Sequence, residues 1–208
     1  MEHKIIVVGI GPGSPDYLPP VAGRAIAAAT VLVGSSRALA TFAPENCETK
    51  VVDRDIGAVL DFIGLRLVQG NVTVLVSGDP GFYSLLAALR AEFAPEDLEV
   101  IPGISSVQLA FARLACPWQD AELISLHGRE ADTARLAYRA GAKLAFLTDG
   151  KYRPRQIAAL LLELGWPADA RAWLCADLSY PTEQIAGGQL AAFAGTDGYE
   201  HSVMVVMA

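Results

Sequence analysis

The sequence predicts an α/β protein of two domains, and three observations support this class. Short aliphatic runs typical of buried strands alternate with helical stretches through the first half of the 208 residues. Glycine-rich turns follow three of these runs. The second half begins with the same alternation but ends on two strand-like segments joined by a turn-rich stretch. The first domain is therefore expected to hold a mainly parallel sheet, and the second a mixed sheet.

Five strands are predicted in the first half. Residues 5–8 form a continuous aliphatic run, as expected for a strand that is buried on both faces of a parallel sheet. Further predicted strands lie at residues 31–33, 51–52, 72–76 and 100–101. Helices are predicted between and after them at residues 21–29, 56–68, 83–93 and 106–114.

A domain boundary is predicted at Cys116-Pro117-Trp118, because proline disfavours a helix at and before its own position. This divides the chain into an N-terminal domain, residues 1–117, and a C-terminal domain, residues 118–208. Predicted strands of the second domain lie at residues 123–126, 144–147 and 172–175, with helices at 132–140 and 156–164. The last strand candidates, 183–186 and 202–207, predict an antiparallel end to the sheet.

Composition restricts the function classes. With 52% hydrophobic and 19% charged residues, the chain is typical of a globular protein that folds without a structural metal. The apolar run at residues 5–10 is too short for a signal peptide or a membrane span. Cys47, Cys116 and Cys175 have no metal-binding spacing, which favours reduced thiols in the cytoplasm and no metal site. The net charge of -7 disfavours nucleic acid as a partner.

Three glycine loops follow predicted parallel strands, at residues 9–15, 77–84 and 102–106. Because the carboxyl ends of parallel strands share one edge of the sheet, we expect the loops to form a small-molecule cleft. A nicotinamide site is disfavoured, since Ser14 replaces the third glycine of the dinucleotide motif and Pro12 lacks an amide hydrogen. For one such loop alone, a tight turn without any ligand is an equally good interpretation.

At these loops the chain resembles the tetrapyrrole methylase family. The matching pieces are VGIGPGSPDYL, VLVSGDPGFYS and VIPGISSVQLA, in the family's order and spacing. In the second half LISLHGRE, LAFLTDGKYRP and LSYPTEQI are similar to the branch that methylates C5 of a precorrin ring. The resemblance implies two α/β domains with a cleft between them, S-adenosylmethionine as cofactor and a homodimer. It also implies a freestanding enzyme that could contact a separate C15-methyltransferase and decarboxylase.

The resemblance implies cofactor-binding residues in each loop and in the second domain. They are Gly11, Pro12, Gly13, Ser77, Gly78, Asp79, Ile104, Ser105, Ser106, Thr148 and Leu178.

Asp79 and Tyr83 are the candidate catalytic residues. Asp79 is the carboxylate within the glycine loops, and it could either accept a proton or only form an Asx turn before Pro80. Tyr83 could either pack at the start of a helix or direct its hydroxyl to the cleft. Methyl transfer to an electron-rich ring carbon depends mainly on alignment, so no nucleophilic side chain is required.

Cationic side chains are expected on the substrate side, because precorrins carry many acetate and propionate groups. The candidates are His127, Arg129, Lys151 and Arg153, although any one of them could be a solvated surface charge. Other functions stay open at this point. They are methylation of a different ring carbon, an RNA or diphthamide methyltransferase of the same fold, a module that binds a nucleotide-like ligand without catalysis, and a nicotinamide oxidoreductase.

Overall fold

The computed structural model describes residues 3–125, 132–148, 152–196, 198–199 and 202–208. The chain forms two compact units, Met1–Ser105 and Ser106–Ala208. The sequence analysis places the boundary later, at Cys116-Pro117-Trp118. The difference is the helix α5 (Ser106–Arg113), which packs on strands of the second unit.

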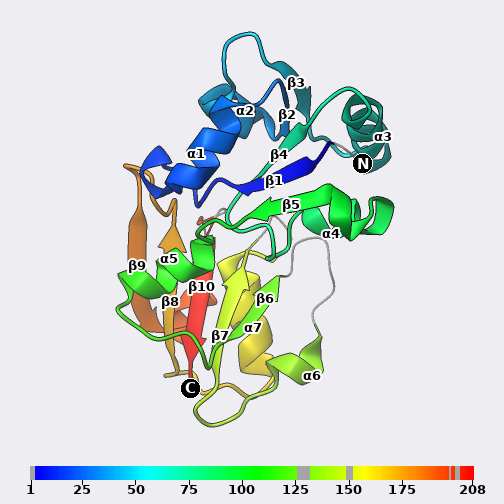
Figure 1. Ribbon diagram of the computed structural model, residues 1–208. Helices are drawn as coiled ribbons and strands as arrows, with labels where there is room; N and C mark the ends of the chain where they lie inside the picture. The colour runs from blue at the N-terminus through cyan, green and yellow to red at the C-terminus, as the bar shows by residue number, and fades with distance from the viewer. Residues whose placement is uncertain (1–2, 126–131, 149–151, 197, 200–201) are drawn as a thin grey trace. The chain divides into compact units, whose positions relative to one another are not determined.

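The first unit contains a five-stranded sheet in the order β3-β2-β4-β1-β5 (Figure 1). All of its strand pairs are parallel, as predicted. The strands are β1 (Ile5–Gly9), β2 (Val31–Gly34), β3 (Glu48–Val51), β4 (Val72–Val76) and β5 (Leu98–Ile101). Every residue of β4 is buried, which explains why its sequence is a continuous run without polar alternation.

Helices cover both faces of this sheet (Figure 1). On one face α3 (Ile56–Leu67) and α4 (Leu86–Glu92) form a core with Ile5 and Val7 of β1. On the other face α1 (Pro20–Ala27) and α2 (Ser36–Phe42) form a core with Val8. Alternate residues of one strand thus contribute to opposite cores. Short 3₁₀ turns, η1 (Pro15–Tyr17) and η2 (Pro95–Asp97), complete the unit.

Two features of this unit differ from the sequence prediction. The helix expected from residue 83 begins three residues later, at Leu86, because Tyr83 has a left-handed backbone with φ of 50°. Tyr83 therefore lies in the turn before α4 and not at the start of the helix. The helix α2 was not predicted from the sequence; its first turn is capped by the Ser35 hydroxyl, which accepts from the amide of Ala38 at 3.2 Å.

The described part of the second unit contains a sheet in the order β6-β7-β10-β8-β9. The strands are β6 (Glu122–Ser125), β7 (Lys143–Leu147), β8 (Arg171–Ala176), β9 (Gln184–Gln189) and β10 (Ser202–Met207). The strands β6 and β7 are parallel, whereas β10 runs antiparallel to both of its neighbours and β8 runs antiparallel to β9. The predicted mixed sheet with an antiparallel end is confirmed.

The described residues of this unit also form the helices α6 (Thr133–Leu136), α7 (Pro154–Glu163) and α8 (Leu190–Phe193). The predicted helix at residues 132–140 is too long, because the backbone turns extended at Ala137. The core combines strand residues such as Phe146, Leu174 and Met204 with Leu161 of α7. Within the described residues, no helix has the length and apolar character that crossing a membrane requires.

Candidate functional site

The three glycine loops lie side by side in the first unit. They follow β4, β1 and β5, and β1 lies between the other two strands in the sheet. We call residues 9–13, 77–82 and 102–105 the loop cluster. Open α/β sheets bind ligands at this edge, beyond the carboxyl ends of their strands. The expectation that the loops share one edge is confirmed.

The first and second loops are joined by backbone hydrogen bonds. The amide of Gly78 donates to the carbonyl of Gly11 at 2.8 Å, and the amide of Gly11 donates to the carbonyl of Gly78 at 3.3 Å. Both residues have left-handed backbones, with φ of 78° at Gly11 and 70° at Gly78. Glycine is favoured at both positions because residues with a Cβ atom rarely adopt this conformation.

The third loop packs directly against the other two. A Cβ atom on Gly103 would lie 2.2 Å from the carbonyl oxygen of Gly78, and one on Gly9 would lie 2.6 Å from the amide nitrogen of Gly103. These distances are far inside van der Waals contact. The structure shows that Gly9 and Gly103 allow the loops to approach one another.

Asp79 links two of the loops through its carboxylate. One oxygen, Oδ1, accepts a hydrogen bond from the amide of Gly81 at 2.8 Å, which forms the Asx turn considered in the sequence analysis. The other oxygen, Oδ2, accepts from the amide of Gly103 in the third loop at 3.1 Å. The structural role of Asp79 is thus visible in its contacts, whereas its catalytic role stays a prediction.

Side chains with different polarity surround this hydrogen-bonded framework. Ser77 is exposed, and so are Tyr83 and Ile104, while Pro12 and Gly13 are half-buried. Ser105, the last residue of the third loop, is buried. Exposed hydroxyl, aromatic and aliphatic side chains in and next to these loops suit a ligand with both polar and apolar parts. Ser106 begins α5 and belongs to the second unit.

Thr148 directly follows β7 in the second unit, and its hydroxyl is engaged within that unit. It donates to the carbonyl of Ser202 at 2.8 Å and accepts from the amide of the same residue at 3.1 Å. Ser202 begins β10, so this contact joins the ends of two neighbouring strands. The cofactor contact that the resemblance implies for Thr148 is not tested by these bonds and stays a prediction.

Leu178 lies in the connection between β8 and β9 and is 6% exposed. Its neighbours Asp177 and Ser179 both have left-handed backbones, with φ of 47° and 75°. The Glu183 carboxylate accepts a hydrogen bond from the amide of Ser179 at 2.7 Å through Oε2. Its other oxygen, Oε1, accepts from Nε of Arg113 on α5 at 2.6 Å. The turn around Leu178 is thereby fixed to a helix of the same unit.

Arg113 and Glu183 were not predicted from the sequence, because no sequence pattern pairs residues that are 70 positions apart. The hydrogen bond from Arg113 is the largest cause that holds the pKa of Glu183 below its ordinary value, and the Ser179 amide acts in the same direction.

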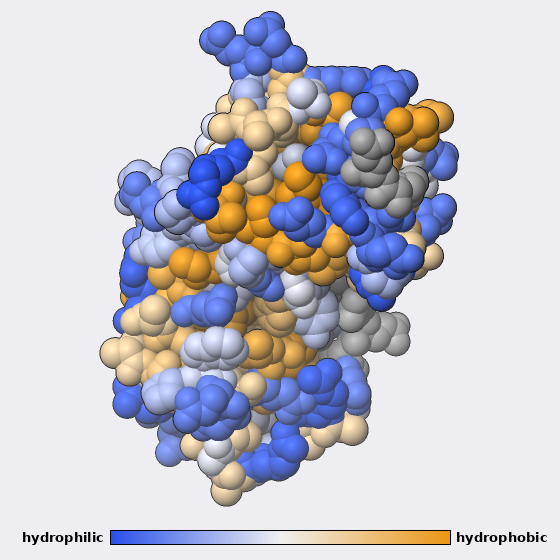
Figure 2. All heavy atoms as spheres, viewed as in Figure 1, coloured by the Kyte–Doolittle hydropathy of each residue, from blue (hydrophilic) through white to orange (hydrophobic). Residues whose placement is uncertain are grey.

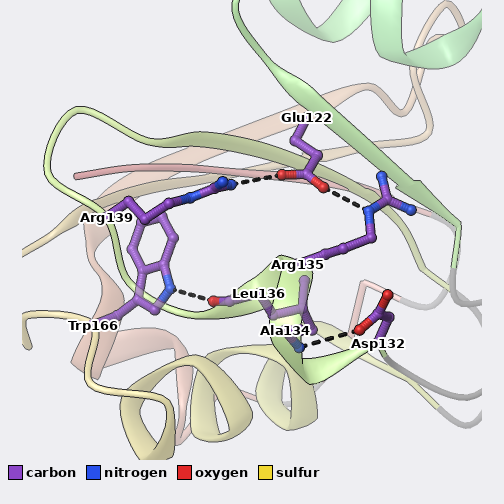
Figure 3. Close-up of polar contacts among 7 residues, drawn as sticks. All are labelled: Glu122, Asp132, Ala134, Arg135, Leu136, Arg139 and Trp166. Carbon is purple, nitrogen blue, oxygen red and sulfur yellow. Dashed lines mark hydrogen bonds and ion pairs between the residues drawn. The ribbon is translucent and has the colours of Figure 1, made fainter.

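The substrate candidates are only partly described. His127, Arg129 and Lys151 lie outside the described residues. Arg153 is exposed at the N-cap position of α7. The residues that flank the segment 126–131 are well anchored, however (Figure 3).

Glu122 of β6 is the centre of that anchoring. It pairs with Arg135 at 2.6 Å and with Arg139 at 2.8 Å, which connects β6 to α6 and to the turn after it. Asp132 caps α6 by accepting from the amide of Ala134 at 3.1 Å. The indole of Trp166 donates to the carbonyl of Leu136 at 2.8 Å.

Comparisons with known proteins agree with the motif resemblance. The family model of the tetrapyrrole (corrin/porphyrin) methylases matches residues 4–194. A cobalt-precorrin-7 C(5)-methyltransferase of Salmonella typhimurium is 39% identical over 161 residues, which is 77% of this chain and 79% of that protein. A probable cobalt-precorrin-7 C(5)-methyltransferase of Methanocaldococcus jannaschii is 33% identical over 198 residues, which is 93% of this chain and 92% of that protein.

A solved structure of similar fold is that of a precorrin-6Y methylase from Archaeoglobus fulgidus. It is 26% identical, covers 98% of this chain and 97% of its own, and has a TM-score of 0.73. The match of the family model and the identity to the two relatives establish the family, and this structural similarity agrees with them. The chain belongs to the tetrapyrrole (corrin/porphyrin) methylase family.

Proposed function

We propose that this protein is an S-adenosylmethionine-dependent methyltransferase that acts at C5 of precorrin-7 or cobalt-precorrin-7 in cobalamin biosynthesis. The observation that carries the choice of reaction is the 39% identity to the Salmonella C5-methyltransferase over 161 residues. The loop cluster supports the choice of cofactor, because it lies at the edge of the sheet where α/β proteins bind nucleotide-like ligands.

The residues present fit this cofactor in chemical type. An adenosyl group offers a flat base and a polar ribose, and its partners are usually apolar side chains with a few well-placed polar groups. At the loop cluster, exposed Ile104 supplies an apolar side chain and exposed Ser77 supplies a polar group. We propose that they bind the cofactor together with Gly11, Pro12, Gly13, Gly78 and Ser105. Ser106, Thr148 and Leu178 are proposed from the family resemblance.

When bound, S-adenosylmethionine supplies a methyl group activated by a positively charged sulfur. The task left to the chain is to hold the acceptor carbon in line and to exclude water, and alignment of this kind can contribute about 7–11 kcal/mol. The hydrogen bonds between the loops favour such alignment, because they fix the positions of the loops that would contact the ligand. The Tyr83 hydroxyl is proposed to face the cleft and to help orient the ring.

Substrate binding is proposed to depend on cations. His127, Arg129, Lys151 and Arg153 are the candidates, because a guanidinium group can grip a carboxylate through two hydrogen bonds. A homodimer, a cytoplasmic location and contact with a separate C15-methyltransferase and decarboxylase are also proposed. Sedimentation at micromolar concentration tests the first of these.

Calorimetry and mass spectrometry test the proposed function. We expect one molecule of S-adenosylhomocysteine to bind per chain, and no heat with NAD. Incubation with S-adenosylmethionine and a series of precorrins should add one methyl group, of about 14 mass units, to the precorrin-7 type alone. Binding of NAD without binding of S-adenosylhomocysteine would contradict the cofactor assignment. Methylation of a different precorrin would contradict the assignment of C5.

A further inference from the structure

Asp79 occupies a special position in the loop cluster, because its side chain connects the second loop with the third. Its two carboxylate oxygens accept from different loops, Oδ1 from Gly81 at 2.8 Å and Oδ2 from Gly103 at 3.1 Å. The first and second loops need no such side chain, since the backbones of Gly11 and Gly78 already bond to each other in both directions.

Among the glycines of the loop cluster, Gly103 is the one at which an added Cβ atom would come closest to another loop. The carbonyl of Gly78 and the backbone of Gly9 both lie within 3 Å of the place where its Cβ atom would be. Its amide hydrogen is directed to Asp79. The position of Gly103 is therefore set by packing on one side and by the Asp79 carboxylate on the other.

The residues after Gly103 depend on this arrangement. Ile104 follows directly and is exposed, and Ser105 comes next and is buried. A shift of Gly103 would move both of them. Ser105 would also move relative to Gly78, which lies close to it: a Cβ atom added to Gly78 would be 3.4 Å from the Cα atom of Ser105.

We propose that Asp79 is a positioning residue, whose carboxylate acts through the Gly103 amide to hold the third loop where it binds the adenosyl cofactor. The proposal rests on the proposed function for the identity of the ligand. It gives Asp79 a different task from that of a base, which would have to reach the substrate itself.

Asp79→Asn is the decisive variant, because it keeps the size of the side chain but replaces one acceptor oxygen by an NH₂ donor. That group would face the amide of either Gly103 or Gly81, and one of the two bonds is lost. Asp79→Ser is the second variant, since a single short hydroxyl can keep the turn to Gly81 without reaching Gly103. Asp61→Asn on α3 is the control, because it removes the same charge from an exposed position.

Three measurements on the full chain are needed. The first is amide hydrogen exchange of Gly103 without ligand, which should be at least about tenfold faster in Asp79→Ser, because its hydroxyl does not reach Gly103. The second is the affinity for S-adenosylhomocysteine well below the unfolding temperature, which should fall by about tenfold, or about 1.4 kcal/mol. The third is the pH dependence of kcat at saturating ligands, which should keep its shape. Asp61→Asn should match the unaltered protein in all three.

Each other outcome overturns the proposal. A catalytic base predicts unchanged affinity, a loss of kcat of about 10²–10⁴-fold and a missing limb of the pH profile. A merely structural role predicts a lower unfolding temperature with unchanged affinity in the folded protein. Failure of both Asp79 variants to fold, while the control folds, would assign Asp79 to fold stability alone. If the unaltered protein does not bind S-adenosylhomocysteine, the proposed function fails, while the exchange measurement still tests the link to Gly103.

Discussion

The glycines of the loop cluster are needed for two different physical reasons. Gly78 has a left-handed backbone with φ of 70°, but a Cβ atom there would meet only Ser105, at 3.4 Å or more. Gly103 has no such backbone requirement, but its Cβ atom would overlap the Gly78 carbonyl oxygen. Conformation selects glycine at the first position, and contact between backbones selects it at the second.

Alanine substitutions should separate these two reasons. Gly78→Ala should lower the free energy of unfolding by about 1–2 kcal/mol, the cost of a left-handed residue with a Cβ atom. Gly103→Ala should lower it by more than about 3 kcal/mol, because overlap with backbone atoms cannot be relieved by a rotamer change. Urea unfolding with constant m-values measures both.

Gly70→Ala is the control for these variants, since a Cβ atom at Gly70 would meet nothing within 4 Å. Its free energy of unfolding should be unchanged or slightly higher. A larger loss for Gly78→Ala than for Gly103→Ala would show that the close packing of the loops is not the stronger constraint.

At the scale of elements, the contact between α5 and the turn after β8 is the clearest case of a side chain that fixes a strained connection. The Glu183 carboxylate bonds to Arg113 of α5 and to the amide of Ser179, beside the left-handed residues Asp177 and Ser179. Such backbones persist where surrounding contacts hold them, and they are frequent in ligand-binding segments.

Glu183→Gln should therefore destabilise the protein near neutral pH by about 1 kcal/mol, a value that allows for solvent screening of a partly exposed pair. The pKa of Glu183 is lowered in the folded state. Its contribution is thus complete above the ordinary pKa of a glutamate and is lost as the pH falls through the lowered value. Unfolding curves of the variant and the unaltered protein should differ at pH 7 and converge in acid.

The pair Arg66–Glu48 in the first unit provides a matched control for this experiment. Its arginine also binds the carboxylate through two nitrogens, at 2.7 and 2.6 Å, but the Glu48 side chain is 43% exposed, against 20% for Glu183. Glu48→Gln should have a smaller effect on stability than Glu183→Gln. Equal effects of the two variants at pH 7 would mean that the turn after β8 needs no support from Arg113.

The elements that the sequence predicts best are those that are buried on both sides. The strand at residues 72–76 was predicted with its observed bounds, because burial on both faces requires an uninterrupted apolar run. The short α2 and α8 were missed, since seven or four residues are too few to show a helical period.

For the candidate site, the meeting of the loops was predictable from the sequence, but the contacts that hold them together were not. Glycine motifs and strand order in the sequence indicated that the loops meet at one edge, as they do. The reason for each glycine was not predictable, because the contact between Gly9, Gly78 and Gly103 arises only when three separate strands pair. The link from Asp79 to Gly103 and the pair Arg113–Glu183 have the same origin, and neither depends on local sequence pattern.

At the scale of the whole molecule, each unit has its own hydrophobic core. Two cores lie on the faces of the first sheet, and the core around Phe146, Leu161 and Leu174 lies in the second unit. The surface is mixed, and Figure 2 shows hydrophobic side chains among hydrophilic ones on the viewed face. With a net charge of -7, the chain as a whole repels an anionic ligand. A polycarboxylate substrate must therefore meet a local group of cations.

This requirement leads to a prediction about Arg129. Arg129→Ala should raise KM for the precorrin by about tenfold or more, since about 1.4 kcal/mol of lost interaction corresponds to that factor. Affinity for S-adenosylhomocysteine should stay unchanged, because the cofactor is proposed to bind at the loop cluster. Arg153→Ala should act in the same direction, with an effect limited by solvent screening because Arg153 is exposed.

Salt and a control variant decide whether charge is the cause. Raising the ionic strength from about 0.01 M to 0.1 M shortens the screening length from about 30 Å to about 10 Å, so KM for the precorrin should change with salt more than affinity for the cofactor does.

Arg90→Ala on α4 removes an exposed arginine outside the proposed substrate group and should have unaltered kinetics. If Arg129→Ala matches Arg90→Ala at equal protein concentration, Arg129 is a surface residue. If it weakens both ligands equally, the substitution has damaged the fold. Electrostatic attraction requires that Arg129→Ala weakens precorrin binding selectively and that this loss becomes smaller at high salt. The reason is that salt screens the attraction to Arg129 in the unaltered protein, which is the same attraction that the substitution removes.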